Sequence, residues 1–184
     1  DQAGDRMRDG RAGGANGARP YLVIRLGTVP PERESRAGYR RWQVFDQFRY
    51  EVIDGVLYVS AAPSRKHQDV IVALHLIMGG YVESGQLGRV YTAPFGVVLD
   101  TFTGVEPDLV YVSRARPRQV SSRGLEGAPD LVVEVLSPST WQLDRGIKMQ
   151  RYARAGIPHY WIIDPLAETL EAYELADGAY TLTA

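Results

Sequence analysis

The chain contains no cysteine among its 184 residues, which excludes a disulfide framework, a thiolate zinc site and a cysteine nucleophile. It also has almost no net charge, since 21 basic and 22 acidic residues leave a formal charge of −1. That balance gives no overall attraction to nucleic acid, although it allows a local basic face. No apolar run approaches the ~20 residues of a membrane span, and the N-terminus lacks an apolar signal core. We therefore expect a cytoplasmic protein that makes no membrane contact.

Lysine is scarce as well, because only Lys66 and Lys148 accompany 19 arginines. A GC-rich coding sequence is enough to produce this bias, so the bias by itself assigns no function. It does limit any chemistry that needs a lysine amine to two side chains. Four arginines fall in one predicted loop, where phosphate contacts and a plain solvated loop remain equal alternatives. They are Arg114, Arg116, Arg118 and Arg123.

Composition divides the chain into two parts. Residues 1–20 hold five glycines and four arginines and almost nothing large and apolar, so they cannot bury enough surface to offset the entropy of ordering. The segment Tyr21–Leu26 is apolar enough for a short strand or a docked arm. We predict a flexible N-terminal leader or arm over residues 1–41 and one globular domain over residues 42–184.

A β-hairpin and a long helix are predicted to open the globular domain. The β-prone runs Tyr50–Ile53 and Val56–Val59 flank Asp54-Gly55, which is typical of a type I′ hairpin turn. Ser64 is placed to cap a helix that continues to about Glu83. Apolar residues at three- and four-residue spacing predict its buried stripe. They are Val70, Ile71, Leu74, Ile77, Met78, Tyr81 and Val82.

The rest of the chain alternates between apolar runs and one helical pattern. Strands are predicted at Arg89–Leu99, Val105–Val112, Leu131–Leu136, Tyr160–Ile163, Thr169–Leu175 and Tyr180–Leu182. A helix is predicted from about Trp141 to Ala155, where Gly156 and Pro158 end it. The order of these elements indicates an α/β sandwich around a mixed sheet.

Two predicted strands each carry a carboxylate, Asp108 on the first and Glu134 on the second. Neighbouring strands lie only ~4.8 Å apart, so the two side chains can converge if these strands pair. Asp130 points the same way as Glu134 but lies about 13 Å from it along the strand. That distance is too long for a shared metal ion, so we expect Asp130 to cap or turn the strand start.

The charges of Asp108 and Glu134 need a partner, because two ionised carboxylates at close range repel by roughly 4 kcal/mol. A divalent cation between them is one solution, and Mg²⁺ or Mn²⁺ suits carboxylate oxygens with water completing the shell. A structural ion pair of Glu134 with Lys148 or with an arginine is the other solution. Spacing alone leaves the two open.

Four segments, in this order and spacing, carry a resemblance to a known family. They read R-Y-E-V-I-D-G, V-E-P-D-L-V-Y-V, D-L-V-V-E-V-L-S-P-S-T and K-x-x-x-Y-A-R-A-G-I-P-x-Y-W-I-I-D. Over residues 42–184 the chain resembles the "putative restriction endonuclease" family of the PD-(D/E)xK nuclease superfamily. The resemblance implies a restriction-endonuclease-like core, in which helices flank a mixed β-sheet with an N-terminal β-hairpin. It also implies phosphodiester hydrolysis with Mg²⁺ or Mn²⁺.

The resemblance departs from the superfamily pattern at one position. The parent pattern has a lysine two residues after the strand acid, where this chain has Leu136. The resemblance implies that the lysine has moved to the following helix, which favours Lys148 over Lys66. Lys148 also has a plain alternative, a surface pair with Asp144 four residues earlier on the same helix.

The remaining site residues follow from the resemblance. It implies that the backbone carbonyl of Val135 joins Asp108 and Glu134 as a metal ligand, and that Glu51 is a third acid near the ion, with plain solvent exposure as the alternative. It also places His67 near the site, although a histidine in a helix cap needs no function. The other two histidines, His75 and His159, are interpreted as structural.

These observations give two hypotheses about function. In the first, the protein is a metal-dependent DNA endonuclease in which Asp108, Glu134, Lys148 and Glu51 are catalytic. In the second, it is a catalytically inactive nuclease fold that binds nucleic acid or a protein partner. A homodimer is expected in the first case, because cutting two strands calls for two sites and twofold pairs are the commonest assemblies.

Overall fold

The computed structural model describes residues 22–25, 48–115, 119–122 and 124–184. Its strands form two sheets. The first has the order β1-β3-β2-β6-β5-β9-β8, with β1 Leu22–Arg25, β2 Phe48–Ile53, β3 Val56–Ala61, β5 Val97–Asp100, β6 Thr103–Val105, β8 Gln119–Ser121 and β9 Gly124–Glu126. The second has the order β13-β12-β11-β10-β7-β4, with β4 Gly88–Thr92, β7 Leu109–Ser113, β10 Leu131–Val135, β11 His159–Asp164, β12 Thr169–Ala176 and β13 Ala179–Leu182.

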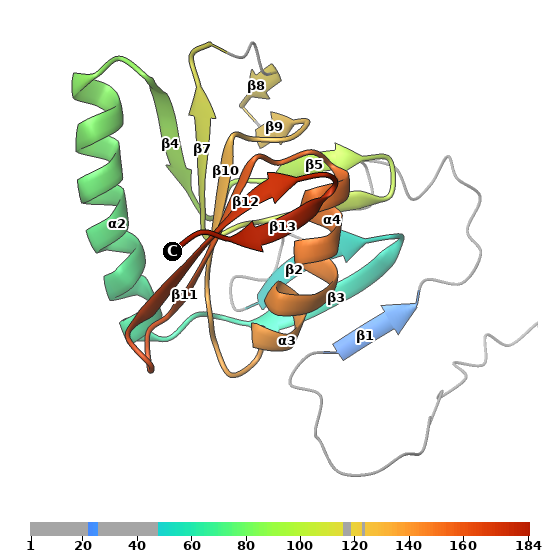
Figure 1. The fold of residues 1–184 in the computed structure, drawn as a ribbon. Coiled ribbons are helices and arrows are strands. Elements are labelled where there is room, and N and C mark those ends of the chain that lie inside the picture. The colour runs from blue at the N-terminus through green and yellow to red at the C-terminus, as the bar shows by residue number, and fades with distance from the viewer. Residues whose placement is uncertain (1–21, 26–47, 116–118, 123) are drawn as a thin grey trace, which may run out of the picture.

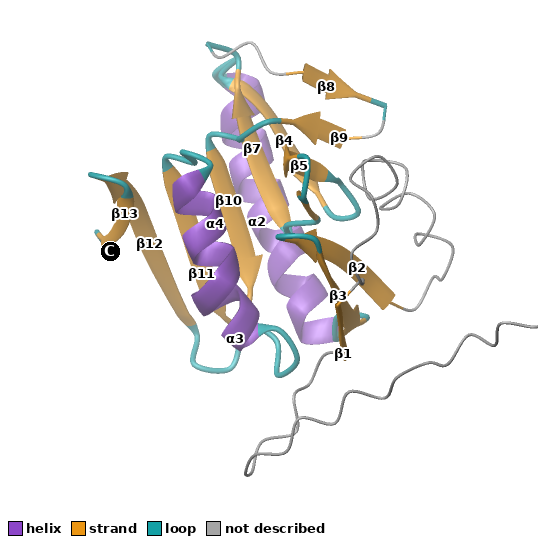
Figure 2. Ribbon diagram, turned by 90° about the vertical axis from the view of Figure 1, so that its right-hand side faces the viewer, coloured by secondary structure: helices purple, strands orange, loops and turns teal. Residues whose placement is uncertain are grey.

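Helices cover both faces of the six-stranded sheet (Figure 1). On one face lies α2, Arg65–Ser84. On the other lies a short helical segment made of α3 Trp141–Leu143, a π-helical turn Asp144–Lys148 and α4 Met149–Arg154, as Figure 2 shows from a second direction. In the described ranges, no helix is long and apolar enough to cross a membrane. The predicted α/β fold with a nuclease-like core and flanking helices is confirmed.

Strand β10 divides the core, because its side chains alternate between the two faces of the sheet. Leu131, Val133 and Val135 belong to the apolar cluster that contains Ile71 of α2. Val132 belongs to the larger cluster, which includes residues of α4 and of the seven-stranded sheet. By the same alternation Glu134 shares the face of Val132. The fold therefore turns one carboxylate toward the helical segment and the second sheet.

The predicted hairpin and helix cap are confirmed. Strands β2 and β3 pair antiparallel, and the turn residues Asp54 and Gly55 both have positive φ angles, 55° and 72°, as a type I′ turn requires. The Ser64 side chain accepts a 3.3 Å hydrogen bond from the backbone N–H of His67. The predicted stripe of α2 is partly wrong, since Ile77 and Tyr81 are 71% and 72% exposed. The apolar stripe is wider than the face that the sheet covers.

Two predicted strands are each divided between the sheets. Residues 89–99 form the end of β4 and the start of β5, and residues 105–112 form the end of β6 and most of β7. A proline lies in each break, Pro94 and Pro107. Proline has no N–H to donate, so it interrupts a hydrogen-bonded ladder and lets the chain leave one sheet for the other. The predicted single mixed sheet is therefore two mixed sheets.

The N-terminal predictions are only partly covered by the described residues. Within Tyr21–Leu26, Leu22–Arg25 is strand β1, which pairs antiparallel with β3. The rest of the predicted leader, residues 1–41, lies outside the described residues, as do Arg116, Arg118 and Arg123 of the arginine loop. The remainder of that loop holds strands β8 and β9, which the sequence did not predict.

Candidate active site

The register of β7 and β10 brings Asp108 and Glu134 to neighbouring positions. The strands pair antiparallel with Leu109 opposite Val133, so the next positions along each chain are Asp108 and Glu134. The Asp108 carboxylate, through Oδ2, accepts a 2.8 Å hydrogen bond from the backbone N–H of Val135. Both carboxylates are buried, each with 1% exposure. The strand pairing on which the sequence argument depended is therefore present.

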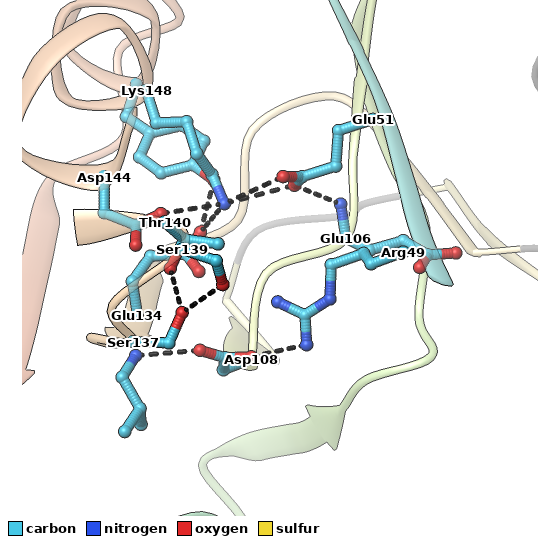
Figure 3. A network of polar contacts seen from close by, with 12 residues as sticks. Arg49, Glu51, Glu106, Asp108, Glu134, Ser137, Ser139, Thr140, Asp144 and Lys148 are labelled. Atoms are coloured by element: carbon cyan, nitrogen blue, oxygen red, sulfur yellow. Dashed lines mark hydrogen bonds and ion pairs between the residues drawn. The ribbon is translucent and has the colours of Figure 1, made fainter. Parts of the chain in front are cut away.

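Lys148 reaches Glu134 from the helical segment. Its Nζ lies 2.6 Å from Glu134 Oε1, 3.1 Å from Glu51 Oε1 and 3.3 Å from Asp144 Oδ1. Figure 3 shows these three contacts converging on one ammonium group. Burial alone would lower the pKa of Lys148, but the three carboxylates raise it well above its ordinary value. The pair with Asp144, which the sequence offered as the alternative role of Lys148, is present, but it is not a surface pair because both side chains are buried.

Asp108 already has a guanidinium group and an imidazole ring as neighbours. Arg49 Nη2 lies 2.6 Å from its Oδ1, a contact that Figure 3 shows. His67 Nε2 lies 3.1 Å from its Oδ2. Burial acts to raise the pKa of Asp108, but the charge of Arg49 and the contacts with His67 and Val135 outweigh it and hold the pKa well below its usual range. Asp108 is therefore ionised in the folded protein at neutral pH.

Glu134 is held in a different electrostatic state. Its Oε1 accepts a 2.7 Å hydrogen bond from the hydroxyl of Tyr152, on α4. Burial raises the pKa of Glu134 to about 8, against the opposing charge of Lys148, and nearby carboxylates add to the increase. Burial likewise raises the pKa of Asp144 to about 6. Two acids of this site therefore bind protons more readily than free carboxylic acids do.

Glu51 belongs to the site as well. It is 2% exposed, which excludes the alternative of plain solvent exposure. Its Oε1 accepts a 2.9 Å hydrogen bond from the backbone N–H of Glu106, and its Oε2 accepts one of 3.3 Å from Lys148. Strand β2 of the seven-stranded sheet thus supplies Glu51, while β10 of the other sheet supplies Glu134. The site forms where the two sheets and the helical segment meet.

We define the acid cluster as six neighbouring charged residues in two contacting sets, Arg49 with Asp108 and Lys148 with three carboxylates. It consists of the cations Arg49 and Lys148 and the carboxylates Glu51, Asp108, Glu134 and Asp144. With every group ionised, four negative charges face two positive ones. One divalent cation would offset this excess, and carboxylate oxygens are the donors that Mg²⁺ and Mn²⁺ prefer. In composition and charge, the cluster fits such an ion.

The present arrangement of the acid cluster is closed by its own cations. Among the described residues, no three acidic or histidine side chains already surround one point as metal ligands. Asp108 faces Arg49, and Glu134 faces Lys148. Metal binding by Asp108, Glu134 and the Val135 carbonyl therefore stays a prediction, and it requires these carboxylates to exchange part of their present contacts for the ion.

Two buried polar atoms accept no hydrogen bond within the described part of the chain. They are His67 Nδ1 and Asp144 Oδ1, whose 3.3 Å contact with Lys148 is an ion pair without hydrogen-bond geometry. The contact of His67 Nε2 with the ionised Asp108 favours a proton on Nε2, which leaves Nδ1 with a free lone pair. The site thus retains some unused capacity to accept hydrogen bonds. His75 and His159, by contrast, are exposed, as is Lys66.

Sequence reasoning missed Arg49 and Tyr152 in this network, and it named Asp144 only as a surface partner of Lys148. Arg49 lies two residues before Glu51 on the same strand, and strand alternation puts the two on one face. Asp144 and Tyr152 lie four residues before and after Lys148, so they share its side of the helical segment. The sequence shows this spacing, but it could not show that these side chains are buried together. Asp130 acts as predicted, because its Oδ2 accepts a 2.7 Å hydrogen bond from the backbone N–H of Ser113.

Comparison with known proteins identifies the family of this chain. Residues 36–184 match the Uma2 family, described as "Putative restriction endonuclease". The chain belongs to this family. An uncharacterized protein of Synechocystis is 26% identical to this Uma2 chain over 158 residues, which are 85% of this chain and 82% of that protein.

A solved structure described as a putative nuclease from Anabaena variabilis supports the same fold. It superposes on this Uma2 protein with a TM-score of 0.61 at 20% identity, covering 72% of this chain and 75% of that one. At this identity the likeness concerns the fold. The suspected relationship and the nuclease-like core are therefore both confirmed.

Proposed function

We propose that this Uma2 protein is a metal-dependent endonuclease that hydrolyses phosphodiester bonds in DNA. The observation that carries the proposal is the pairing of Asp108 and Glu134 across β7 and β10, with Lys148 Nζ 2.6 Å from Glu134. Two buried acids and an amine at this spacing suit hydrolysis of a phosphate ester. Membership of a family described as "Putative restriction endonuclease" supports the same conclusion.

The proposal gives each residue a role. Asp108, Glu134 and the Val135 carbonyl would hold Mg²⁺ or Mn²⁺, which when bound would polarise the scissile phosphate and make a nearby water more acidic. Lys148 stays protonated, because three carboxylates raise its pKa, so it acts as a positive hydrogen-bond donor that orients the attacking water. Glu51 fixes the position of that ammonium group through their direct contact.

A supercoiled-plasmid nicking assay with Mn²⁺, Mg²⁺ or EDTA tests the proposal. Two matched variants are available, because Asp108 and Asp130 both follow a proline and both are buried. Wild type and Asp130→Asn should nick DNA in the presence of either metal, whereas Asp108→Asn should be slower by roughly 100-fold or more. Equal cutting by all three proteins, or cutting in EDTA, would contradict the proposal.

One observation favours the alternative, a nuclease fold that binds without cutting. Arg49 and Lys148 already neutralise Asp108 and Glu134, so the carboxylates have a purely structural explanation. Thermal unfolding separates the two functions. An ion bound by the acid cluster raises the melting temperature with its concentration, and Asp108→Asn removes this rise. Plasmid that stays intact, together with a melting temperature that no divalent ion changes, would select the binding function.

A further inference from the structure

Helix α2 presents an apolar face that no other described element covers. Its large side chains Val72, Leu76, Ile77 and Tyr81 are 56%, 70%, 71% and 72% exposed. In Figure 1 this helix lies at the outer edge of the molecule, with the six-stranded sheet on its inner side only. A contiguous apolar surface of this kind marks an interaction site more often than single exposed residues do.

Charge is arranged on this face in a way that suits one particular partner. The stretch Val70–Val82 contains no acidic residue, lysine or arginine. Exposed charged residues bound it. Arg65, Lys66 and Asp69 lie at the N-terminal end, where Arg65 pairs with Asp69 at 2.9 Å, and Glu83 lies at the C-terminal end, 3.8 Å from Arg89. Because Arg65 pairs with Asp69, Lys66 is the cation that an identical antiparallel helix would bring against Glu83 at each end. Antiparallel helices also align their macrodipoles favourably.

The spacing of residues on this face is self-complementary in size. Positions 66, 69, 73, 76, 80 and 83 follow steps of three and four, which place them along one side of the helix. When two copies are set antiparallel about a twofold axis at the midpoint of that stripe, Ala73 faces Leu76, Asp69 faces Gly80 and Lys66 faces Glu83. Large side chains then meet small ones, and opposite charges meet at both ends.

The glycine in this stripe supports a close approach. A Cβ added at Gly80 would meet no atom of the described residues within 4 Å, so this part of the protomer gives no packing reason for a glycine there. Glycine in an exposed helix interior costs helix stability relative to alanine. A second helix that packs closely over this position supplies the missing reason, since only glycine lets the two backbones come together.

We infer that the protein forms a twofold dimer through the outer face of α2, with Ala73 and Leu76 at its centre. In each protomer the site residue His67 lies near the N-terminal end of α2. The two His67 positions of the dimer are therefore about 22 Å apart along the helix axis, and the dimer carries two separate sites. The inference does not depend on the proposed nuclease activity, because the interface residues lie outside the acid cluster.

Sedimentation velocity of the full chain over a concentration series tests the dimer. Wild type should sediment as a dimer, and Leu76→Glu should weaken association by about 100-fold or more, because it buries carboxylates near the twofold axis. Leu76 is largely exposed in the protomer, so circular dichroism and thermal melting should show a folded variant. A wild type that is monomeric at all concentrations, or a dimer that Leu76→Glu leaves intact, overturns the inference.

A charge exchange tests the antiparallel register independently. Lys66→Glu places two carboxylates opposite each other at both ends of the interface and should weaken association by roughly tenfold. The double variant Lys66→Glu with Glu83→Lys should restore the wild-type dissociation constant. If the single variant has no effect, or if the second substitution brings no recovery, the antiparallel pairing is wrong.

Discussion

Lys148 shows at the scale of one residue how this protein stabilises buried charge. It is 1% exposed and lies within 3.3 Å of three carboxylates, so its ammonium group replaces hydration with ionic contacts. Removing one partner from a buried ionic network lowers the free energy of unfolding by more than the whole network contributes to it. The reason is that the remaining buried charges no longer have an opposite charge beside them. The sequence could name Lys148, since the chain has only two lysines, but it could not show this burial.

Lys148→Met should destabilise the protein by about 3–5 kcal/mol at pH 8, because it leaves Glu51, Glu134 and Asp144 without their shared cation. The loss should be smaller at pH 5, where these carboxylates can take up protons. Urea denaturation at both pH values measures it. Arg154→Met, an exposed cation on the same helical segment, should change the free energy of unfolding by less than about 0.5 kcal/mol. Equal effects of the two variants would refute the buried network.

Two buried tyrosines allow a matched comparison. The Tyr152 hydroxyl donates to Glu134 at 2.7 Å, and the Tyr160 hydroxyl donates to the backbone carbonyl of Asp144 at 3.0 Å. At pH 9, where Glu134 is ionised, Tyr152→Phe should cost about 1.5–3 kcal/mol and Tyr160→Phe about 0.5–1.5 kcal/mol, because bonds to charged acceptors are stronger. Chemical denaturation measures both. A larger loss for Tyr160→Phe would argue against an ionised Glu134.

At the scale of elements, local patterns predicted structure well wherever local chemistry decides it. Asp54-Gly55 predicted the β2–β3 turn, and Ser64 predicted the start of α2, because both signals act over a few residues. Local patterns gave wrong predictions where contacts between residues far apart in the sequence decide the structure. An apolar run such as residues 89–99 has the same appearance whether it forms one strand or parts of two strands in different sheets.

The parallel pairing of β5 and β9 can be tested with two glycines, Gly124 at the start of β9 and Gly127 directly after its end, which both have positive φ angles. A Cβ at Gly124 would lie 2.0 Å from the carbonyl oxygen of Gly96, whereas a Cβ at Gly127 would meet no atom of the described residues within 4 Å. Gly124→Ala should therefore cost more than about 2 kcal/mol through combined strain and overlap. Gly127→Ala should cost only about 1–2 kcal/mol, from its φ of 106°.

Thermal denaturation of both variants measures this difference. Each 1 kcal/mol lowers the melting temperature of a domain of this size by about 2–4 °C. Equal shifts for the two alanine variants would show that the β9 backbone can move away from Gly96.

At the scale of the whole molecule, the site exists only because two sheets and a helical segment meet. Glu51 comes from the seven-stranded sheet, Glu134 from the six-stranded sheet and Lys148 from the π-helical turn between α3 and α4. π-Helical turns occur often at functional sites. Burial of these acids couples the stability of the entire fold to pH.

In buffer free of divalent ions, the free energy of unfolding should fall as pH rises from about 4 to about 8. Burial raises the pKa of Glu134 to about 8 and that of Asp144 to about 6, so the folded state binds more protons than the unfolded chain in this window. Protonation therefore favours folding, and the stabilisation is lost as pH rises through these values. The total change should be a few kcal/mol.

Urea denaturation at unit pH intervals measures this slope. Glu134→Gln keeps the shape of the side chain but removes its titration, so the slope above pH 6 should flatten. A free energy of unfolding that rises between pH 5 and pH 8 would contradict the assignment. Asp108 does not disturb the test, because its lowered pKa affects stability only below about pH 4.

The sequence alone determined the kinds of chemistry available here: no thiol, two lysines, and the acids Asp108 and Glu134 in apolar runs. It also determined the hairpin turn and the helix cap, because those signals are local. Tertiary structure decided which charges face each other. Arg49 pairs with Asp108 across 59 positions and Lys148 with Glu51 across 97, and no local pattern encodes such distances. Burial of ionic groups is set by packing between sheets, so only the folded chain could show it.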